Sequence, residues 1–156
     1  MYEYFEEKLS MKQAIFPGSF NPFTLGHKDI LDRALTIFDK VIVAIGINAE
    51  KTIAADAENR AEKIRACYVD NPNVEVRIYS GLTVDLCREC EVYTLIRGIR
   101  DCADWEYERK MADVNRMLDS RVETIYLQTS PQYASISSSV VREIEHYGGD
   151  VSQLIP

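Results

Sequence analysis

Residues 16–27 read Phe-Pro-Gly-Ser-Phe-Asn-Pro-Phe-Thr-Leu-Gly-His, and this stretch decides how the chain is interpreted. It follows an apolar strand pattern at 14–16 and leads into an amphipathic pattern typical of a helix. Its two glycines and two prolines predict a turn whose backbone amides are open to a ligand. His27 falls in the first turn of the predicted helix, where unpaired N–H groups favour an anion. The pattern indicates a phosphate site, and a βα turn with a capping histidine is the alternative.

Apolar, β-rich runs alternate with helical patterns along the rest of the chain. The runs lie at 13–16, 41–47, 74–79, 93–96 and 124–127, and the helical patterns at 26–38, 56–69, 83–91, 103–118 and 138–147. Such alternation predicts βαβ units and a parallel sheet. We therefore expect an α/β protein with a Rossmann-like nucleotide-binding fold, in which helices flank a five-stranded parallel sheet. The G-x-G-x-x-G motif of Rossmann dinucleotide sites is absent.

Length and composition favour one domain of an ordinary globular protein. The 156 residues are 46% hydrophobic and 28% charged. We expect one nucleotidyltransferase domain over 12–156, with 1–11 as a leader or extension outside the fold. Residues 1–10 precede a second methionine, so a remnant of cloning, an alternative start and a real extension stay open. No apolar run reaches the length of a bilayer span, and we expect a cytoplasmic protein without a membrane partner.

The net charge and the positions of the cysteines further restrict the class of protein. The net charge of −7 argues against a nucleic-acid partner, because such proteins usually present a basic face. Cysteines stand at 67, 87, 90 and 102. Cys87 and Cys90 form a C-x-x-C, but no second ligand pair stands at zinc-like spacing. We favour reduced thiols and no protein metal site, with a metal or redox role as the alternative.

Several polar motifs follow predicted strands, and the carboxyl ends of parallel strands meet at one edge of a sheet, where ligands collect. They are 16–27, 48–52, 97–100 and 135–139. A histidine, a lysine, arginines and serine-capped helix starts are groups that hold phosphates and stabilise phosphoryl transfer. No Ser-His-Asp or Cys-His arrangement suggests a covalent intermediate. The second histidine, His146, is explained by its place at a helix C-terminus.

Three of these motifs resemble signatures of a known family. Thr24, Gly26 and His27 stand at the positions of the T-x-G-H signature of nucleotidylyltransferases. Residues 97–100 and 135–139 resemble two signatures of the phosphopantetheine adenylyltransferases, and the match runs from about residue 12 to 156. The resemblance implies transfer of the adenylyl group of ATP to 4′-phosphopantetheine, which yields dephospho-coenzyme A and pyrophosphate in coenzyme A biosynthesis. It implies direct in-line attack without a covalent enzyme intermediate.

The resemblance also assigns roles to residues. It makes His27 the transition-state stabiliser, with Lys51 and Arg100 as further catalytic residues. The substrate-binding residues it implies are Ser19, Lys51, Thr83 and Arg97. The ATP-binding residues it implies are Ser19, Phe20, His27, Gly98, Ile99, Arg100, Glu108, Tyr133, Ala134, Ser135, Ile136, Ser137, Ser138 and Ser139. Asn21 replaces an aspartate that is common in the family, so the resemblance implies no charge-dependent role at this position.

Several of these residues also have simpler explanations. Lys51 reads on its own as a solvated loop lysine, and residues 104–108 as a solvated helix face. An ion pair with Asp101 or Asp104 would account for an arginine at 97 or 100.

The family resemblance further implies Mg²⁺ bound mainly by phosphates and water, a homohexamer, and coenzyme A as a candidate feedback ligand. The nearest rival is a nicotinamide or nicotinate mononucleotide adenylyltransferase, and a catalytically silent nucleotide-binding module is the rival from another class. The motif at 97–100 and the acidic-aromatic run after it favour the pantetheine family.

Overall fold

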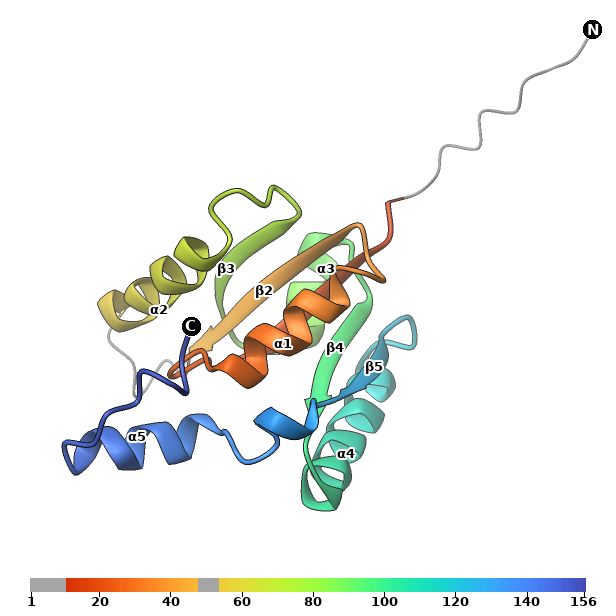
Figure 1. Cartoon of the computed structure of the whole chain (residues 1–156). Helices are drawn as coiled ribbons and strands as arrows, with labels where there is room; N and C mark the ends of the chain where they lie inside the picture. Colours follow the sequence, from red (N-terminus) through yellow and green to blue (C-terminus); the bar gives the residue numbers. More distant parts are fainter. Residues whose placement is uncertain (1–10, 48–53) are drawn as a thin grey trace, which may run out of the picture.

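A sheet of five parallel strands forms the centre of the molecule (Figure 1). The computed structural model describes residues 11–47 and 54–156. The strands are β1 (Gln13–Gly18), β2 (Lys40–Ile47), β3 (Val74–Ser80), β4 (Thr94–Ile99) and β5 (Glu123–Gln128), in the order β3-β2-β1-β4-β5. The predicted Rossmann-like α/β architecture is confirmed.

Helices alternate with these strands as the sequence predicts. They are α1 (Leu25–Ala34), α2 (Ala54–Cys67), α3 (Thr83–Cys90), α4 (Cys102–Leu118) and α5 (Ser138–His146), with a short 3-10 turn, η1 (Pro131–Tyr133), before α5. No helix in the described parts of the chain is long and apolar enough to cross a membrane.

Two boundaries differ from the prediction by more than two residues. Helix α1 ends at Ala34 rather than at residue 38, although Leu35 and Phe38 still pack against the core. The spacing of apolar residues predicts which side chains are buried, and here buried side chains continue beyond the last helical hydrogen bond. The spacing therefore predicted a helix that is too long. Strand β4 runs to Ile99, so Arg97 lies inside the strand and only Arg100 follows it.

Both faces of the sheet are covered by apolar side chains. On one face Phe16 and Val43 pack against Ile30 of α1 and Ile64 of α2. On the other face the neighbouring strand residues Ile15, Ile42 and Leu95 pack against Val84 and Leu86 of α3. Burial on both faces explains why the strands read as continuous apolar runs rather than as alternating ones.

Strands β1 and β4 lie side by side at the centre of the sheet, where the chain order changes direction. Successive strands extend from β1 to one edge and from β4 to the other, and ligands of such sheets bind in the crevice beyond the strands at this point. The topology therefore brings the loop after β1 next to the end of β4. Helix α5 runs back from η1 toward α2 along the same end of the sheet (Figure 1).

Candidate active site

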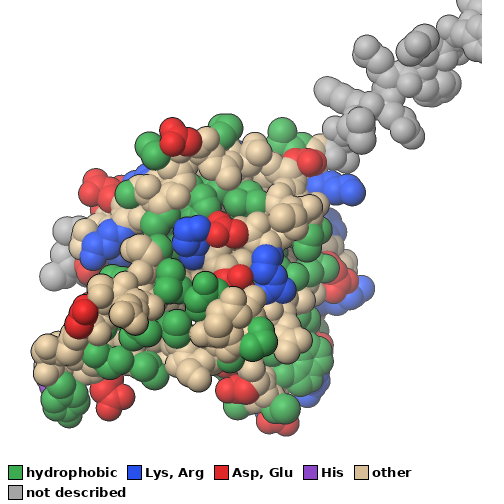
Figure 2. Space-filling view, in the orientation of Figure 1, with side chains coloured by type: hydrophobic (Ala, Val, Ile, Leu, Met, Phe, Trp, Pro, Cys, Tyr) green, Lys and Arg blue, Asp and Glu red, His purple; other side chains and the backbone are tan. Residues whose placement is uncertain are grey.

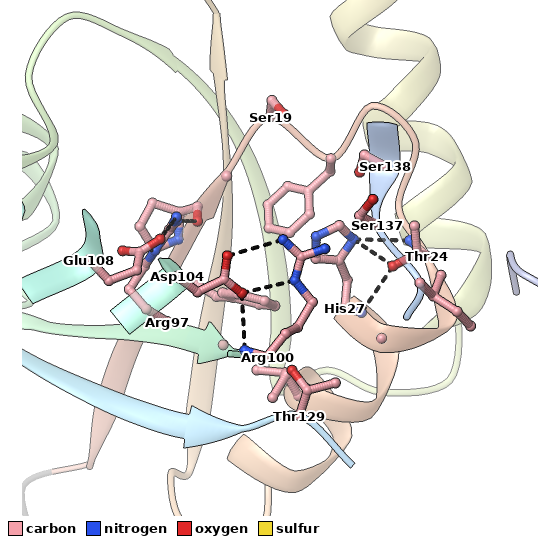
Figure 3. A pocket seen from close by; sticks show the side chains of 18 of the residues that line it. Ser19, Thr24, His27, Arg97, Arg100, Asp104, Glu108, Thr129, Ser137 and Ser138 are labelled. Carbon is pink, nitrogen blue, oxygen red and sulfur yellow. Dashed lines mark hydrogen bonds and ion pairs between the residues drawn. The ribbon is translucent and has the colours of Figure 1, made fainter. Parts of the chain in front are cut away.

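A cavity of about 270 Å³ opens at this crevice. Its walls come from the β1–α1 loop, the end of β4, the first turns of α4 and the start of α5 (Figure 3). The predicted site residues that line it are Ser19, Phe20, His27, Arg97, Gly98, Arg100, Glu108, Ile136, Ser137, Ser138 and Ser139. Three of the four predicted motifs, 16–27, 97–100 and 135–139, thus converge as the topology argument expects, and the fourth, 48–52, lies outside the described residues.

His27 is held at the start of α1 by a reciprocal pair of hydrogen bonds. The Thr24 hydroxyl oxygen accepts from the His27 backbone N–H at 3.3 Å, and the His27 Nδ1 accepts from the Thr24 backbone N–H at 3.0 Å. This is a capping box in which histidine takes the usual place of glutamate. Because Nδ1 is an acceptor, the neutral ring carries its proton on Nε2. The histidine therefore both caps the helix and lines the cavity.

Aromatic rings surround His27 and keep it uncharged. The Phe23 ring stacks on the imidazole with centroids 5.7 Å apart, and the Phe20 ring meets it edge-on at 5.1 Å. Burial lowers the pKa of His27 to about 4, and the positive charges of Arg97 and Arg100 act in the same direction. Near neutral pH the ring is thus a neutral hydrogen-bond donor through Nε2–H.

The glycine at the end of β1 makes room for one of these rings. A Cβ added to Gly18 would lie 3.0 Å from the Phe20 ring, which is too close for the ring to stay in place. Phe20 itself has a φ of +47°, in the left-handed region. The Phe20 ring is buried, whereas Ser19 lies at the crest of the turn (Figure 3).

Arg97 connects β4 with both α4 and the end of β1. Its Nε and Nη2 donate to the two carboxylate oxygens of Glu108 at 2.8 Å and 2.6 Å. Its Nη1 donates to the backbone carbonyl of Pro17. All three guanidinium nitrogens are therefore engaged, which fixes the side chain in one orientation.

Arg100 is paired as well, but one end of it stays open. Its Nε and Nη2 donate to Asp104 at 2.9 Å and 3.1 Å. This pairing raises the pKa of Arg100 and lowers the pKa of Asp104. Within the described chain, Nη1 of Arg100 has no hydrogen-bond partner. Asp101 instead caps α4 by accepting from the Asp104 backbone N–H at 2.9 Å.

The structure thus bears out the ion-pair alternative for Arg100, which pairs with Asp104, whereas Arg97 pairs with Glu108 instead of Asp101 or Asp104. Both arginines still line the cavity. Basic and acidic side chains lie beside one another across the middle of this face of the molecule (Figure 2).

The start of α5 contributes polar groups from the other side of the cavity. Ser137 caps the helix by accepting from the Val140 N–H at 3.2 Å. The Ser138 hydroxyl donates to the Pro22 carbonyl at 2.8 Å and so ties α5 to the loop. The first backbone amides of a helix have no partner within it, and this end of the helix dipole is positive. The amides of Ser138 and Ser139 are therefore suited to an anion.

A second cavity of about 250 Å³ adjoins the first. The two share a wall formed by Pro17, Gly18, Ser19, Arg97 and Glu108. The predicted substrate residue Thr83 lines this second cavity, and its hydroxyl lies 3.0 Å from the Tyr79 hydroxyl. Apolar side chains of α4, Met111 and Ala112, complete the wall. The site therefore has two compartments, separated by the turn after β1.

Not every predicted residue is found at the cavities. Ile99, Tyr133, Ala134 and Ser135 are absent from both linings. Lys51 lies outside the described residues.

Arg60, in α2, is a residue that the sequence interpretation missed. Only 8% of it is exposed, and it donates to the Ser19 carbonyl. A signal was available, because Arg60 shares the buried helix face of Ala57, Ala61 and Ile64.

The described residues at the two cavities offer no protein cage for a metal ion. The carboxylates that line the first cavity, Asp104 and Glu108, are each bound to an arginine. No cluster of three potential ligands occurs within the described ranges. Cys87 and Cys90 lie in the last turn of α3, away from the cavities, and burial raises the pKa of Cys87 to about 11. A magnesium ion at this site would take its ligands from phosphates and water.

Comparison with known proteins identifies relatives over nearly the whole chain. The cytidylyltransferase-like family model matches residues 15–144. The phosphopantetheine adenylyltransferase of Porphyromonas gingivalis is 52% identical over 143 residues, which cover 92% of this chain and 93% of the relative. The enzyme of the same name from Bacteroides thetaiotaomicron is 47% identical over 146 residues, covering 94% and 96%.

A solved structure from Vibrio parahaemolyticus, provisionally assigned as a nicotinate-nucleotide adenylyltransferase, superimposes with a TM-score of 0.66. The match covers 93% of both chains at 23% sequence identity, so it supports the shared fold alone.

Proposed function

The chain belongs to the phosphopantetheine adenylyltransferases, a family of nucleotidyltransferases, and from this premise we propose that it transfers the adenylyl group of ATP to 4′-phosphopantetheine. The products are dephospho-coenzyme A and pyrophosphate, as in coenzyme A biosynthesis. The observation that carries the proposal is the pair of adjoining cavities with a shared wall at residues 17–19. A two-substrate transfer needs two such compartments with the reacting atoms brought together between them.

We assign ATP to the first cavity. Its polar groups are the amides at the start of α5, the open end of Arg100 and the Nε2–H of His27. These are donors for a triphosphate, and the neutral imidazole donates without repelling the nearby guanidinium groups. Phe20 and the serines at 137–139 complete the proposed nucleotide contacts.

We assign phosphopantetheine to the second cavity. Thr83 and the apolar side chains of α4 suit an amide-containing chain with apolar segments, and Ser19 at the shared wall suits its phosphate. Arg97 helps to orient this substrate by fixing the wall. Lys51 remains our proposed contact for the incoming phosphate, on the strength of the family resemblance.

The proposed reaction is a direct displacement. A phosphate oxygen of phosphopantetheine attacks the α-phosphorus of ATP, the bond from that phosphorus to the bridging oxygen breaks, and pyrophosphate leaves. His27 donates through Nε2–H to the α-phosphoryl oxygen on which charge builds, and Arg100 stabilises the leaving group. Magnesium would neutralise part of the phosphate charge. The family resemblance likewise leads us to propose a homohexamer that works in the cytoplasm, with coenzyme A as feedback ligand.

A panel of acceptors tests the proposal. Phosphopantetheine, pantetheine and nicotinamide mononucleotide are each incubated with ATP and magnesium, and pyrophosphate release is measured. We expect release with phosphopantetheine only. Release with the mononucleotide alone would favour the rival adenylyltransferase, and no release with any acceptor would favour a silent binding module.

The stereochemistry of transfer tests the absence of a covalent intermediate. ATP that carries one sulfur at a chiral α-phosphorus serves as the donor, and the configuration of the product is determined. A single in-line displacement inverts the configuration. Retention would require two displacements and therefore a covalent adenylyl-enzyme, which would contradict the proposed mechanism.

A further inference from the structure

Arginines from three different elements bind the backbone at the end of β1 and in the loop that follows it. Each donates to a carbonyl oxygen, and the three carbonyls belong to alternate residues. The pairs, donor first, are Arg97 with Pro17, Arg60 with Ser19, and Arg142 with Asn21. Of these three arginines, Arg60 and Arg142 line neither of the two cavities described above, so they act on the loop from outside.

Arg60 is the most deeply buried of the three. Its side chain is 9% exposed, and its Nη2 lies 3.2 Å from the carboxylate of Asp56. Its Nε is buried without a hydrogen-bond partner among the described residues. A buried polar group without a partner is unfavourable, and an apolar side chain would suit the helix face of Ala61 and Ile64 better. The contact with the Ser19 carbonyl is what an apolar residue could not supply.

That carbonyl belongs to the peptide group at the wall between the two cavities. In a trans peptide the C=O and the following N–H point in opposite directions. Holding the Ser19 carbonyl toward Arg60 therefore directs the Phe20 N–H to the opposite side of the loop. The Ser19 side chain is exposed and lines both cavities, so its position depends on the same peptide group.

We propose that Arg60 is a positioning residue for the transfer reaction: by holding the Ser19–Phe20 peptide it places the Ser19 hydroxyl and the Phe20 N–H against the phosphate of the acceptor. The inference rests on the proposed function and deepens it, because it assigns the acceptor phosphate to the crest of the turn. Arg60 acts through the loop and does not touch either substrate.

Steady-state kinetics of Arg60→Met and Arg60→Lys test the proposal. We expect Arg60→Met to lower kcat/KM for phosphopantetheine by about 10- to 100-fold, the loss typical of reacting groups displaced by roughly an ångström. The Kd of ATP, measured by calorimetry without acceptor, should stay within about 2-fold, because most of the proposed nucleotide contacts, at His27, Arg100 and the start of α5, do not depend on this peptide group. Arg60→Lys keeps one donor and the charge opposite Asp56 and should recover part of the loss.

Arg65, five residues further along α2, provides the matched control. It is exposed, pairs with Glu58, and makes no contact with the loop. Arg65→Met removes the same charge from the same helix and should leave kcat/KM unchanged. Urea unfolding of all variants separates stability from catalysis, since a merely structural role would lower kcat in proportion to the unfolded fraction and leave KM unchanged.

A double-mutant cycle with Ser19→Ala sharpens the test. If Arg60 works through Ser19, the losses of the two single variants will not add in the double variant. Additive losses, or a folded Arg60→Met with wild-type kcat/KM, would overturn the proposal. If Arg60→Met does not fold, an Arg60→Lys variant with unchanged kinetics overturns it equally.

The wild-type protein separates this proposal from the proposed function. Should it use nicotinamide mononucleotide instead of phosphopantetheine, the proposed substrate is wrong. That acceptor also carries a phosphate, so the same variants then decide the role of Arg60 with it.

Discussion

The two rims of the first cavity, residues 17–27 and residues 97–108, hold their polar groups in different ways. The first, which we call the α1 rim, offers an uncharged histidine that is packed among phenylalanines and fixed by Thr24. The second, the α4 rim, offers arginines that are each bound to a carboxylate of α4. The α1 rim is already arranged as a donor, whereas the α4 rim carries charges that a substrate must compete for.

This difference assigns different tasks to the rims. A preorganised neutral donor needs no rearrangement as charge develops, so it is suited to the transition state. An arginine that is already paired gives less binding energy, because part of its charge is compensated before the anion arrives. We therefore expect the α1 rim to control rate and the α4 rim to control binding and rigidity.

Replacing His27 tests the α1 rim and should have the largest effect. His27→Ala removes the Nε2–H donor, and the loss of one such donor lowers kcat by about 10²- to 10³-fold. The Kd of ATP should change far less, since the contact strengthens only as charge builds on the α-phosphate. Rapid-quench kinetics and ATP titration measure the two quantities, with His146→Ala as the control at an exposed helix end. A nearly normal kcat would remove His27 from the mechanism.

The burial of the same histidine predicts a pH dependence of stability. The pKa of His27 is about 4 in the folded chain, whereas an unfolded chain leaves the histidine at its ordinary pKa of 6.5. The free energy of unfolding that the neutral His27 contributes is thus complete above pH 6.5. It is lost as the pH falls toward 4, because between these pH values only the unfolded chain takes up the proton. The loss should amount to ~3 kcal/mol.

The test compares wild type with His27→Gln by urea unfolding between pH 7 and pH 4. The difference in unfolding free energy between the two proteins should shrink as the pH falls. Asp104 and Glu75 also have lowered pKa values, but both proteins share these groups. Parallel curves would show that His27 titrates normally in the folded protein.

Replacing Arg97 and replacing Arg100 should have different effects, the first on stability and the second on ATP affinity. Arg97→Ala leaves Glu108 and the Pro17 carbonyl without their donor, so we expect a loss of stability of about 1–3 kcal/mol. Arg100→Ala removes the open guanidinium end, and the Kd of ATP should rise by about 10-fold because a charge-assisted hydrogen bond is lost. Thermal unfolding and ATP titration of both variants measure this contrast. Equal losses of stability and affinity in the two variants would erase the distinction between them.

The sequence was sufficient for the fold because the relevant signals are local. Apolar spacing along each segment predicted the strands and helices, and the position of each motif after a strand placed the site. The sequence also indicated the helix cap by His27 and the ion pair of Arg100 with Asp104 as alternatives. Both are local interactions, between residues three and four positions apart.

The contacts that sequence reasoning missed join distant parts of the chain. Arg60 and Ser19 are 41 positions apart, and Arg142 and Asn21 are 121 apart. Such contacts depend on the strand order and on the position of α5, neither of which apolar spacing encodes. A buried arginine on a helix face was a visible anomaly, but the sequence could not name its partner.

The smallest effect is expected at Asn21, the residue of the α1 rim that departs from the family pattern. Asn21 is exposed, and within the described chain its backbone carbonyl accepts a hydrogen bond from Arg142. Asn21→Asp keeps that carbonyl and adds a charge that solvent screens, so kcat/KM should stay within about 2-fold of wild type. The measurement is made at low and at high salt, because a screened repulsion between the new carboxylate and the substrates disappears as salt rises. A large loss at both salt concentrations would mean that the α1 rim depends on local charge as the α4 rim does, and the division of tasks between the rims would be wrong.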